Sequence, residues 1–167
     1  MEVEAMLEKG SVQIYYGEGR GKTTAALGNA LRAAGEGKTV VIVQFLKGKR
    51  GANLDYLLRL EPEIRIFRFE KSEGYYNDLS EEAKNEEKMN MKNGLNYAKK
   101  VLVTGECNVL ILDEILGLVD NGVISAEELE AVLQAKTDDV EIIMTGRILE
   151  DSLRDYADEI YHISAEK

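Results

Sequence analysis

The sequence has few of the residues that build disulfides, metal clusters and membrane spans. Its 167 residues include one cysteine, one histidine, one proline and no tryptophan. The single Cys107 excludes an internal disulfide, fits a reducing compartment and, just before an apolar strand, is expected to be a buried inert thiol rather than a nucleophile. His162 has no partner at metal-ligand spacing, so we interpret it as structural.

Long apolar runs and excess positive charge are also missing. No apolar run approaches the roughly 18 residues of a membrane span, and residues 1–10 lack the cationic and apolar regions of a signal peptide. The chain has 21 Lys and Arg against 31 Asp and Glu, a net charge of −10, which argues against nucleic acid as the main partner. We expect a cytoplasmic protein without membrane contact. We predict a single domain over 1–167, with 1–10 as a flexible lead-in.

Short apolar runs alternate with helical patterns along the chain. The runs predict strands at 12–16, 39–45, 64–69, 109–113 and 140–145, with a shorter one at 160–163. The helical patterns lie at 22–35, 80–102 and 125–135. This alternation predicts an α/β fold, a three-layer α/β/α sandwich around a mostly parallel sheet.

The helical segments also predict which side chains face the core. In the first helix we expect an apolar stripe of Ala26, Leu27, Ala30, Leu31 and Ala34. In the second we expect inward-facing Met89, Leu95, Ala98 and Leu102. The acidic run at 81–87 is expected to be a solvated helix face, and Ser80 and Ser125 are typical helix N-caps.

A glycine-rich segment, "GEGRGKTT", follows the first strand and opens the first helix. The usual phosphate-loop pattern, G-x-x-x-x-G-K-[ST], requires a glycine five positions before Gly21. This chain has Tyr16 there, and its glycine comes one residue later, at Gly17. Backbone N–H groups of such a turn bind anions. We therefore predict a P-loop NTPase-like fold whose phosphate loop comprises Gly17, Glu18, Gly19, Arg20, Gly21, Lys22, Thr23 and Thr24.

Polar residues follow three other strands. Lys22 of the loop can reach phosphate oxygens, while Thr23 and Asp113, after the fourth strand, are candidate Mg²⁺ ligands. Glu114 could be a further Mg²⁺ ligand or could polarise an attacking water, so Lys22 and Glu114 are the candidate catalytic residues.

Gln44 and Lys47 emerge from the end of the second strand, and Arg147 follows the fifth. Because ligands bind at the carboxyl ends of strands in open α/β sheets, all three are candidate ATP contacts. The alternatives are a solvated lysine loop and a surface arginine after a turn.

Five motifs together resemble those of the ATP:corrinoid adenosyltransferases that make adenosylcobalamin. They are "GEGRGKTTAA" (17–26), "RAAGEG" (32–37), "VQFLKG" (43–48), "LILDE" (110–114) and "TGR" (145–147). The resemblance implies transfer of the 5′-deoxyadenosyl group of ATP to the cobalt(I) of a reduced corrinoid, with triphosphate as the leaving group and Mg²⁺ as cofactor. It also implies an electron-donating reductase as partner, and a homodimer.

The corrinoid side matches the family less well. Family members have a Gly-Phe-x-Trp-like stretch after the third strand, whose apolar side chains displace the lower cobalt ligand. This chain has Tyr75 and Tyr76 in that interval, and they are our candidates for the corrinoid contact; the alternative is that they pack on the core. A P-loop ATPase or small-molecule kinase, and an ATP-binding regulatory module without corrinoid chemistry, stay open as alternative functions.

Overall fold

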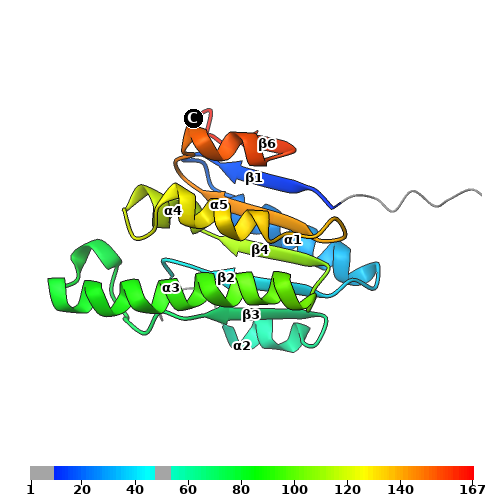
Figure 1. Ribbon diagram of the computed structural model, residues 1–167, viewed down its shortest axis with the longest axis horizontal. Helices are drawn as coiled ribbons and strands as arrows, with labels where there is room; N and C mark the ends of the chain where they lie inside the picture. The colour runs from blue at the N-terminus through cyan, green and yellow to red at the C-terminus, as the bar shows by residue number, and fades with distance from the viewer. Residues whose placement is uncertain (1–9, 48–53) are drawn as a thin grey trace, which may run out of the picture.

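A computed structural model describes residues 10–47 and 54–167 (Figure 1). In these residues six strands form one sheet: β1 (Val12–Tyr16), β2 (Val40–Gln44), β3 (Ile64–Arg68), β4 (Val109–Asp113), β5 (Glu141–Gly146) and β6 (Glu159–His162). Their order is β3-β2-β4-β5-β1-β6, and every neighbouring pair is parallel. The predicted strands are confirmed, with bounds that differ by at most one residue at either end.

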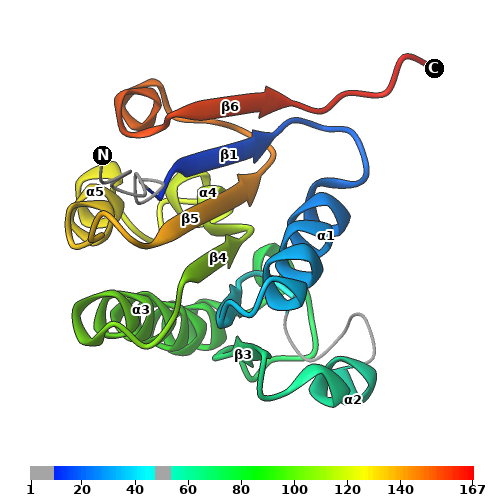
Figure 2. The same ribbon diagram turned by 90° about the vertical axis from the view of Figure 1, so that its right-hand side faces the viewer.

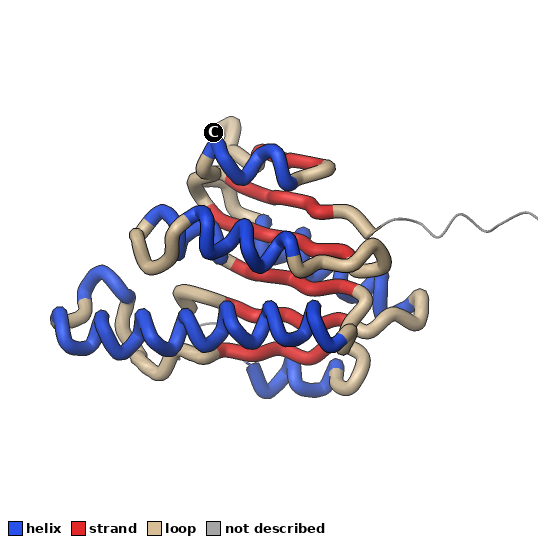
Figure 3. The backbone as a smooth tube through the Cα atoms, in the orientation of Figure 1, coloured by secondary structure: helices blue, strands red, loops and turns tan. Residues whose placement is uncertain are grey.

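Helices cover both faces of the sheet. They are α1 (Lys22–Gly35), α2 (Leu54–Leu57), α3 (Glu81–Thr104), α4 (Ile115–Asp120) and α5 (Ala126–Gln134), with short 3₁₀ helices η1 (Leu58–Leu60), η2 (Tyr76–Asp78) and η3 (Asp151–Tyr156). Figure 2 shows α1 and α2 on one face and α3, α4 and α5 on the other. Figure 3 shows the same layers by secondary structure, with helices in front of and behind the strands. The three-layer α/β/α sandwich is confirmed.

Two side chains that we expected in the core are exposed instead. Leu31 is 54% exposed and Met89 is 68% exposed, whereas Ala33 and Met91 are buried. An α-helix turns by about 100° per residue, so Leu31 lies a quarter turn from buried Ala30, and Met89 lies on the side opposite Met91. The buried stripe of α3 is Met91, Leu95, Ala98, Val101 and Leu102.

The expected caps and the buried thiol are confirmed, but the acidic run is not uniformly solvated. Ser125 forms a capping box with Glu128, and the Ser80 side chain accepts from the Ala83 amide. Burial raises the pKa of the Cys107 thiol to about 11, as expected for an inert thiol. Glu87, however, is 5% exposed, because the segment after β3 returns to α3 and donates the Lys71 and Ser72 amides to its Oε1 at 3.1 and 3.3 Å.

Because all six strands are parallel, their carboxyl ends lie at one edge of the sheet. The residues after β1, β2, β4 and β5 include the phosphate loop, Lys47, Glu114 and Arg147. The sheet therefore gathers segments that are far apart in the chain, as expected for a ligand site in an open α/β sheet. No helix within 10–47 or 54–167 is long and apolar enough to cross a membrane.

Candidate functional site

The displaced glycine of the phosphate loop is explained by the neighbouring strand β6. Gly17 has φ +128°, and a Cβ there would lie 2.2 Å from the Ile163 carbonyl oxygen. The same oxygen accepts the Gly19 amide at 2.9 Å, while the Gly17 amide donates to the Gly146 carbonyl at 3.1 Å. A side chain at position 17 would collide with this backbone. The glycine is thus required by the close approach of β6.

Tyr16, at the position where the usual pattern has glycine, packs against the same part of the molecule. Its ring stacks on His162 with a centroid distance of 4.8 Å, and the Arg154 guanidinium carbon lies 5.5 Å from its ring centroid. The interpretation of His162 as a structural residue in the edge strand is consistent with this contact. Tyr16 therefore anchors the start of the loop to β6 and η3.

Lys22 and Gly21 form the open end of the loop, at the start of α1. The Lys22 side chain is buried, and its Nζ donates to the Gly19 carbonyl at 2.8 Å. Gly21 has φ +106°, and a Cβ there would meet no atom within 4 Å. The lysine thus lies inside the curve of the loop, and the backbone at Gly21 is accessible to an anion at the helix N-terminus.

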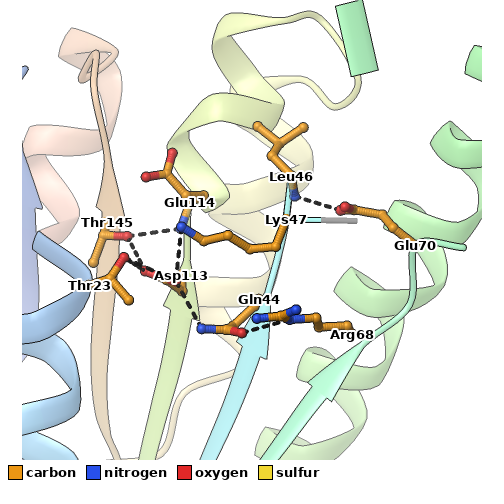
Figure 4. Close-up of polar contacts among 9 residues, drawn as sticks. All are labelled: Thr23, Gln44, Leu46, Lys47, Arg68, Glu70, Asp113, Glu114 and Thr145. Carbon is orange, nitrogen blue, oxygen red and sulfur yellow. Dashed lines mark hydrogen bonds and ion pairs between the residues drawn. The ribbon is translucent and has the colours of Figure 1, made fainter. Parts of the chain in front are cut away.

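Asp113 is the centre of a buried polar cluster (Figure 4). Thr23 Oγ1 lies 2.9 and 3.2 Å from its two carboxylate oxygens, and Thr145 Oγ1 donates to Oδ1 at 2.8 Å. Gln44 Nε2 lies 3.3 Å and Lys47 Nζ 3.9 Å from Oδ2. Asp113 is 1% exposed, and such a carboxylate requires donors of this kind. The structure therefore brings together four of the residues predicted from sequence, Thr23, Gln44, Lys47 and Asp113.

Glu114 lies next to this cluster but points elsewhere. Its backbone is left-handed, with φ 62°, and its amide donates to Thr145 Oγ1 at 2.9 Å. In Figure 4 its carboxylate extends away from that of Asp113. The carboxylate that contacts Thr23 is thus that of Asp113, and Glu114 would have to change rotamer to join it.

Other residues predicted for the ATP site lie on the outer surface of the loop. Arg147 NH2 forms an ion pair with Glu18 at 3.1 Å, with the two side chains 66% and 75% exposed. Arg20 and Thr24 are also exposed. Exposed ion pairs contribute little to stability, so the Arg147 side chain is free to exchange its partner for a bound anion. Gly48 of the "VQFLKG" motif lies outside the described residues, as do residues 1–9 of the lead-in.

The two tyrosines after β3 differ from each other. Tyr75 is 71% exposed. Tyr76 packs against the core cluster, with Lys84 Nζ 5.9 Å from its ring centroid. The alternative interpretation, an aromatic residue packed on the core, therefore describes Tyr76 and not Tyr75.

Sequence reasoning missed three residues of the site. Thr145 bridges Asp113 Oδ1 and the Glu114 amide, and it is the first residue of the "TGR" motif. Arg68 Nε donates to Gln44 Oε1 at 2.8 Å, and Glu70 Oε1 accepts the Leu46 amide at 2.6 Å. The alternating charges of "RFE" at the end of an apolar strand were the available signal.

Two oxygen-bearing side chains beside the phosphate loop fit a hydrated Mg²⁺ ion. Mg²⁺ prefers oxygen ligands and is usually held by one or two carboxylates together with substrate phosphates. The Thr23 hydroxyl and the Asp113 carboxylate supply such oxygens beside the phosphate loop. These two residues could hold the ion.

The chain matches known proteins over most of its length. The family model "ATP:corrinoid adenosyltransferase BtuR/CobO/CobP" matches residues 8–167. Corrinoid adenosyltransferase CobA of Salmonella typhimurium is 31% identical over 157 residues, which cover 94% of this chain and 78% of the relative. The corrinoid adenosyltransferase of Pseudomonas aeruginosa is 25% identical over 164 residues, covering 98% and 79%.

Among solved structures, the flagellar accessory protein FlaH of Methanocaldococcus jannaschii has a similar fold. Its TM-score is 0.60 at 17% identity, covering 93% of this chain and 71% of FlaH. This likeness concerns the fold alone. The family model and the Salmonella relative go further, because they match the segments that form the loop and the Asp113 cluster: the chain belongs to the ATP:corrinoid adenosyltransferase family.

Proposed function

We propose that the protein transfers the 5′-deoxyadenosyl group of ATP to the cobalt(I) of a corrinoid. The electron pair of cobalt(I) forms the cobalt–carbon bond, the C5′–oxygen bond breaks, and triphosphate leaves with the bonding pair. The observation that carries the proposal is the phosphate loop facing the buried Thr23–Asp113 pair, in a chain of this family. The relatives named above are themselves corrinoid adenosyltransferases.

In this reaction the phosphate loop holds the leaving group. Negative charge accumulates on the departing triphosphate, and preorganised donors stabilise such charge. Lys22 Nζ would exchange the Gly19 carbonyl for a phosphate oxygen, a short movement from its observed position. When bound at Thr23 and Asp113, Mg²⁺ would neutralise part of the triphosphate charge.

Gln44 and Lys47 support the same side of the site. Lys47 adds a positive charge beside Asp113, and Gln44 orients the carboxylate. The parts of ATP farther from the Asp113 cluster would be contacted by the outer residues of the loop and its neighbour, which are Glu18, Arg20, Thr24 and Arg147. Arg147 would leave Glu18 to make its contact. Glu114 is a second carboxylate within reach of the metal after a rotamer change.

The corrinoid would bind beyond the carboxyl ends of β2 and β3. The exposed ring of Tyr75 offers an apolar surface to the corrinoid, and Tyr76, packed on the core cluster, would hold the segment in place. The electrons would come from a reductase, and the reaction would take place in the cytoplasm. The chain would act as a single domain and form a homodimer.

The products distinguish this function from its alternatives. The protein is incubated without oxygen with Mg-ATP and cob(I)alamin, and the products are analysed for inorganic triphosphate and a light-sensitive cobalt–carbon bond. We expect both, in equal amounts, and neither without the corrinoid. Orthophosphate released independently of the corrinoid would indicate an ATPase, and ATP binding without any turnover would indicate a regulatory module.

A further inference from the structure

The ends of β3 and β2 are joined by two polar contacts outside the sheet's own hydrogen bonds. Arg68, the last residue of β3, donates from Nε to Gln44 Oε1 at 2.8 Å. Two residues later, Glu70 Oε1 accepts the Leu46 amide at 2.6 Å. Figure 4 shows both contacts on the side of β2 that faces away from Asp113. We call these two contacts the Arg68–Glu70 staple.

The first contact fixes the orientation of the Gln44 amide. A guanidinium only donates hydrogen bonds, so the oxygen of the Gln44 side chain must face Arg68. The NH₂ group must then face the other way, where Asp113 Oδ2 lies at 3.3 Å. Without Arg68 the Gln44 oxygen would lose its donor, and the Asp113 carboxylate alone would hold the orientation of the amide. Gln44 is 4% exposed, so water has little access to replace the lost contact.

The second contact fixes the corner that carries Lys47. Leu46 has φ 58°, a left-handed conformation that is strained for a leucine. The buried Glu70 carboxylate holds its amide, and the next side chain, Lys47, places Nζ 3.9 Å from Asp113 Oδ2. The staple therefore reaches Asp113 by two routes, through Gln44 and through Lys47.

The charges along these routes balance within a poorly solvated region. Glu70 is 8% exposed and Asp113 is 1% exposed, and the positive charges of Arg68 and Lys47 alternate with them. Burial lowers the pKa of the Arg68 guanidinium, and the charges of Glu70 and Asp113 oppose that shift. Arginine stays protonated at physiological pH, so the arrangement holds over the working range of the protein.

We propose that Arg68 and Glu70 are positioning residues for the triphosphate and its metal ion, acting through Gln44 and Lys47 on Asp113. Neither residue contacts ATP in this proposal. It rests on the proposed function only in assigning Mg-ATP to the Asp113 cluster. If it is correct, removing either residue weakens Mg-ATP binding only while its intermediary is present.

The test for Arg68 is a double-mutant cycle on the Kd of Mg-ATP, measured by equilibrium titration without any corrinoid. We expect Arg68→Met to raise the Kd about tenfold in the otherwise unchanged protein, a coupling typical of residues in one network. In a Gln44→Leu background the same change should alter the Kd by less than about twofold. Arg65→Met, which removes a guanidinium from the same strand, is the matched control and should leave the Kd unchanged.

The test for Glu70 uses a conservative variant in addition. Glu70→Ala should raise the Kd, whereas Glu70→Gln keeps an oxygen that can accept the Leu46 amide and should retain most of the affinity. In a Lys47→Met background Glu70→Ala should have little effect. Glu73→Ala, an exposed carboxylate on the following segment, is the matched control. Thermal melting of each variant monitors its fold.

The two proposals fail in different ways. If Arg68→Met and Glu70→Ala weaken Mg-ATP binding by the same factor with and without their intermediaries, the positioning role is overturned, whatever the corrinoid reaction does. If Arg68→Met does not fold, the polar and uncharged Arg68→Gln enters the same cycle, because it also removes the guanidinium; additivity there also overturns the role. Absence of adenosyl transfer by the unchanged protein would reject the proposed function and leave these binding cycles valid. Non-additive cycles would confirm that Arg68 and Glu70 act through Gln44 and Lys47.

Discussion

Asp113 is 1% exposed and is contacted by four side chains, whereas Tyr75, on the segment after β3, is 71% exposed. Asp113 ends β4 and Tyr75 follows β3 of the same sheet, but the chain fixes the first before any ligand binds and leaves the second at the surface. Charged groups must be preorganised to stabilise a leaving triphosphate. A large, mostly apolar ligand can instead be bound by side chains that adjust, because apolar contact is non-directional. The proposed ATP side and the proposed corrinoid side of the site therefore place different demands on the sequence.

The largest effect is expected on the ATP side, at Lys22. Lys22→Ala removes a donor to the triphosphate and should lower kcat about 10²–10³-fold, as for other preorganised donors. The measurement is the rate of cobalt–carbon bond formation at saturating corrinoid, with melting temperature as a check on the fold. Lys99→Ala, an exposed lysine of α3, is the control. Full activity in a folded Lys22→Ala protein would mean that Lys22 is not a preorganised donor to the triphosphate.

Gly17→Ala should have the next largest effect, since its Cβ would lie 2.2 Å from the Ile163 carbonyl oxygen. We expect a loss of about 1–3 kcal/mol in the free energy of unfolding, because a non-glycine residue is strained at φ +128°, together with weaker ATP binding. Gly28→Ala provides the comparison, because a Cβ there would meet nothing within 4 Å. That helical substitution should stabilise the protein by about 0.5–1 kcal/mol. Chemical denaturation measures both, and equal behaviour of the two variants would contradict the role of β6.

The tyrosines test the adjustable side of the comparison. Tyr75→Ala should weaken corrinoid binding several-fold while leaving the melting temperature and the Kd of ATP unchanged, because its ring is exposed. Tyr76→Ala should lower the melting temperature as well, since that ring packs on the core. Fluorescence or absorbance titration with cob(II)alamin measures the first effect. Unchanged corrinoid affinity in both variants would mean that the corrinoid binds at another surface.

The smallest effect is expected at Cys107, away from both sides of the site. Its pKa of about 11 in the folded protein is above the ordinary value of 9.0, because burial disfavours the thiolate. The protonated Cys107 thiol therefore contributes fully to the free energy of unfolding below pH 9.0, and this contribution is lost as the pH rises through 11. At pH 8 the folded protein should not react with iodoacetamide, whereas the unfolded chain should. Rapid labelling of the native protein, measured by mass spectrometry, would show that the thiol is not buried.

The same contrast explains which features of the fold and of the candidate site could be predicted from the sequence. Strand positions, the phosphate loop and the Thr23–Asp113 contact follow from local patterns and from the rule that parallel strands end at one edge. Arg68 and Glu70 could not be assigned, because their role depends on β3 lying beside β2 in a particular register. The stripe of α3 was misjudged at Met89, since the spacing of its apolar residues permits more than one helix face.

The reason for Gly17 was also beyond local pattern, because it depends on Ile163, which is close to it only in the folded chain. Buried Glu87 was hidden in the same way within an acidic run whose other glutamates are exposed. Residues that bind through a local motif could be found from sequence. Residues that act on another segment could not.

The position of β1 in the sheet has a consequence for the synthesis of the protein. Its two neighbours, β5 and β6, are the last two strands of the described residues, and the Val12 amide donates to Asp158, 146 residues later. A growing chain emerges N-terminus first, so the phosphate loop is made before the segments that supply its Gly146 and Ile163 contacts. The loop therefore reaches its final form only after the segments that carry Gly146 and Ile163 have joined the sheet.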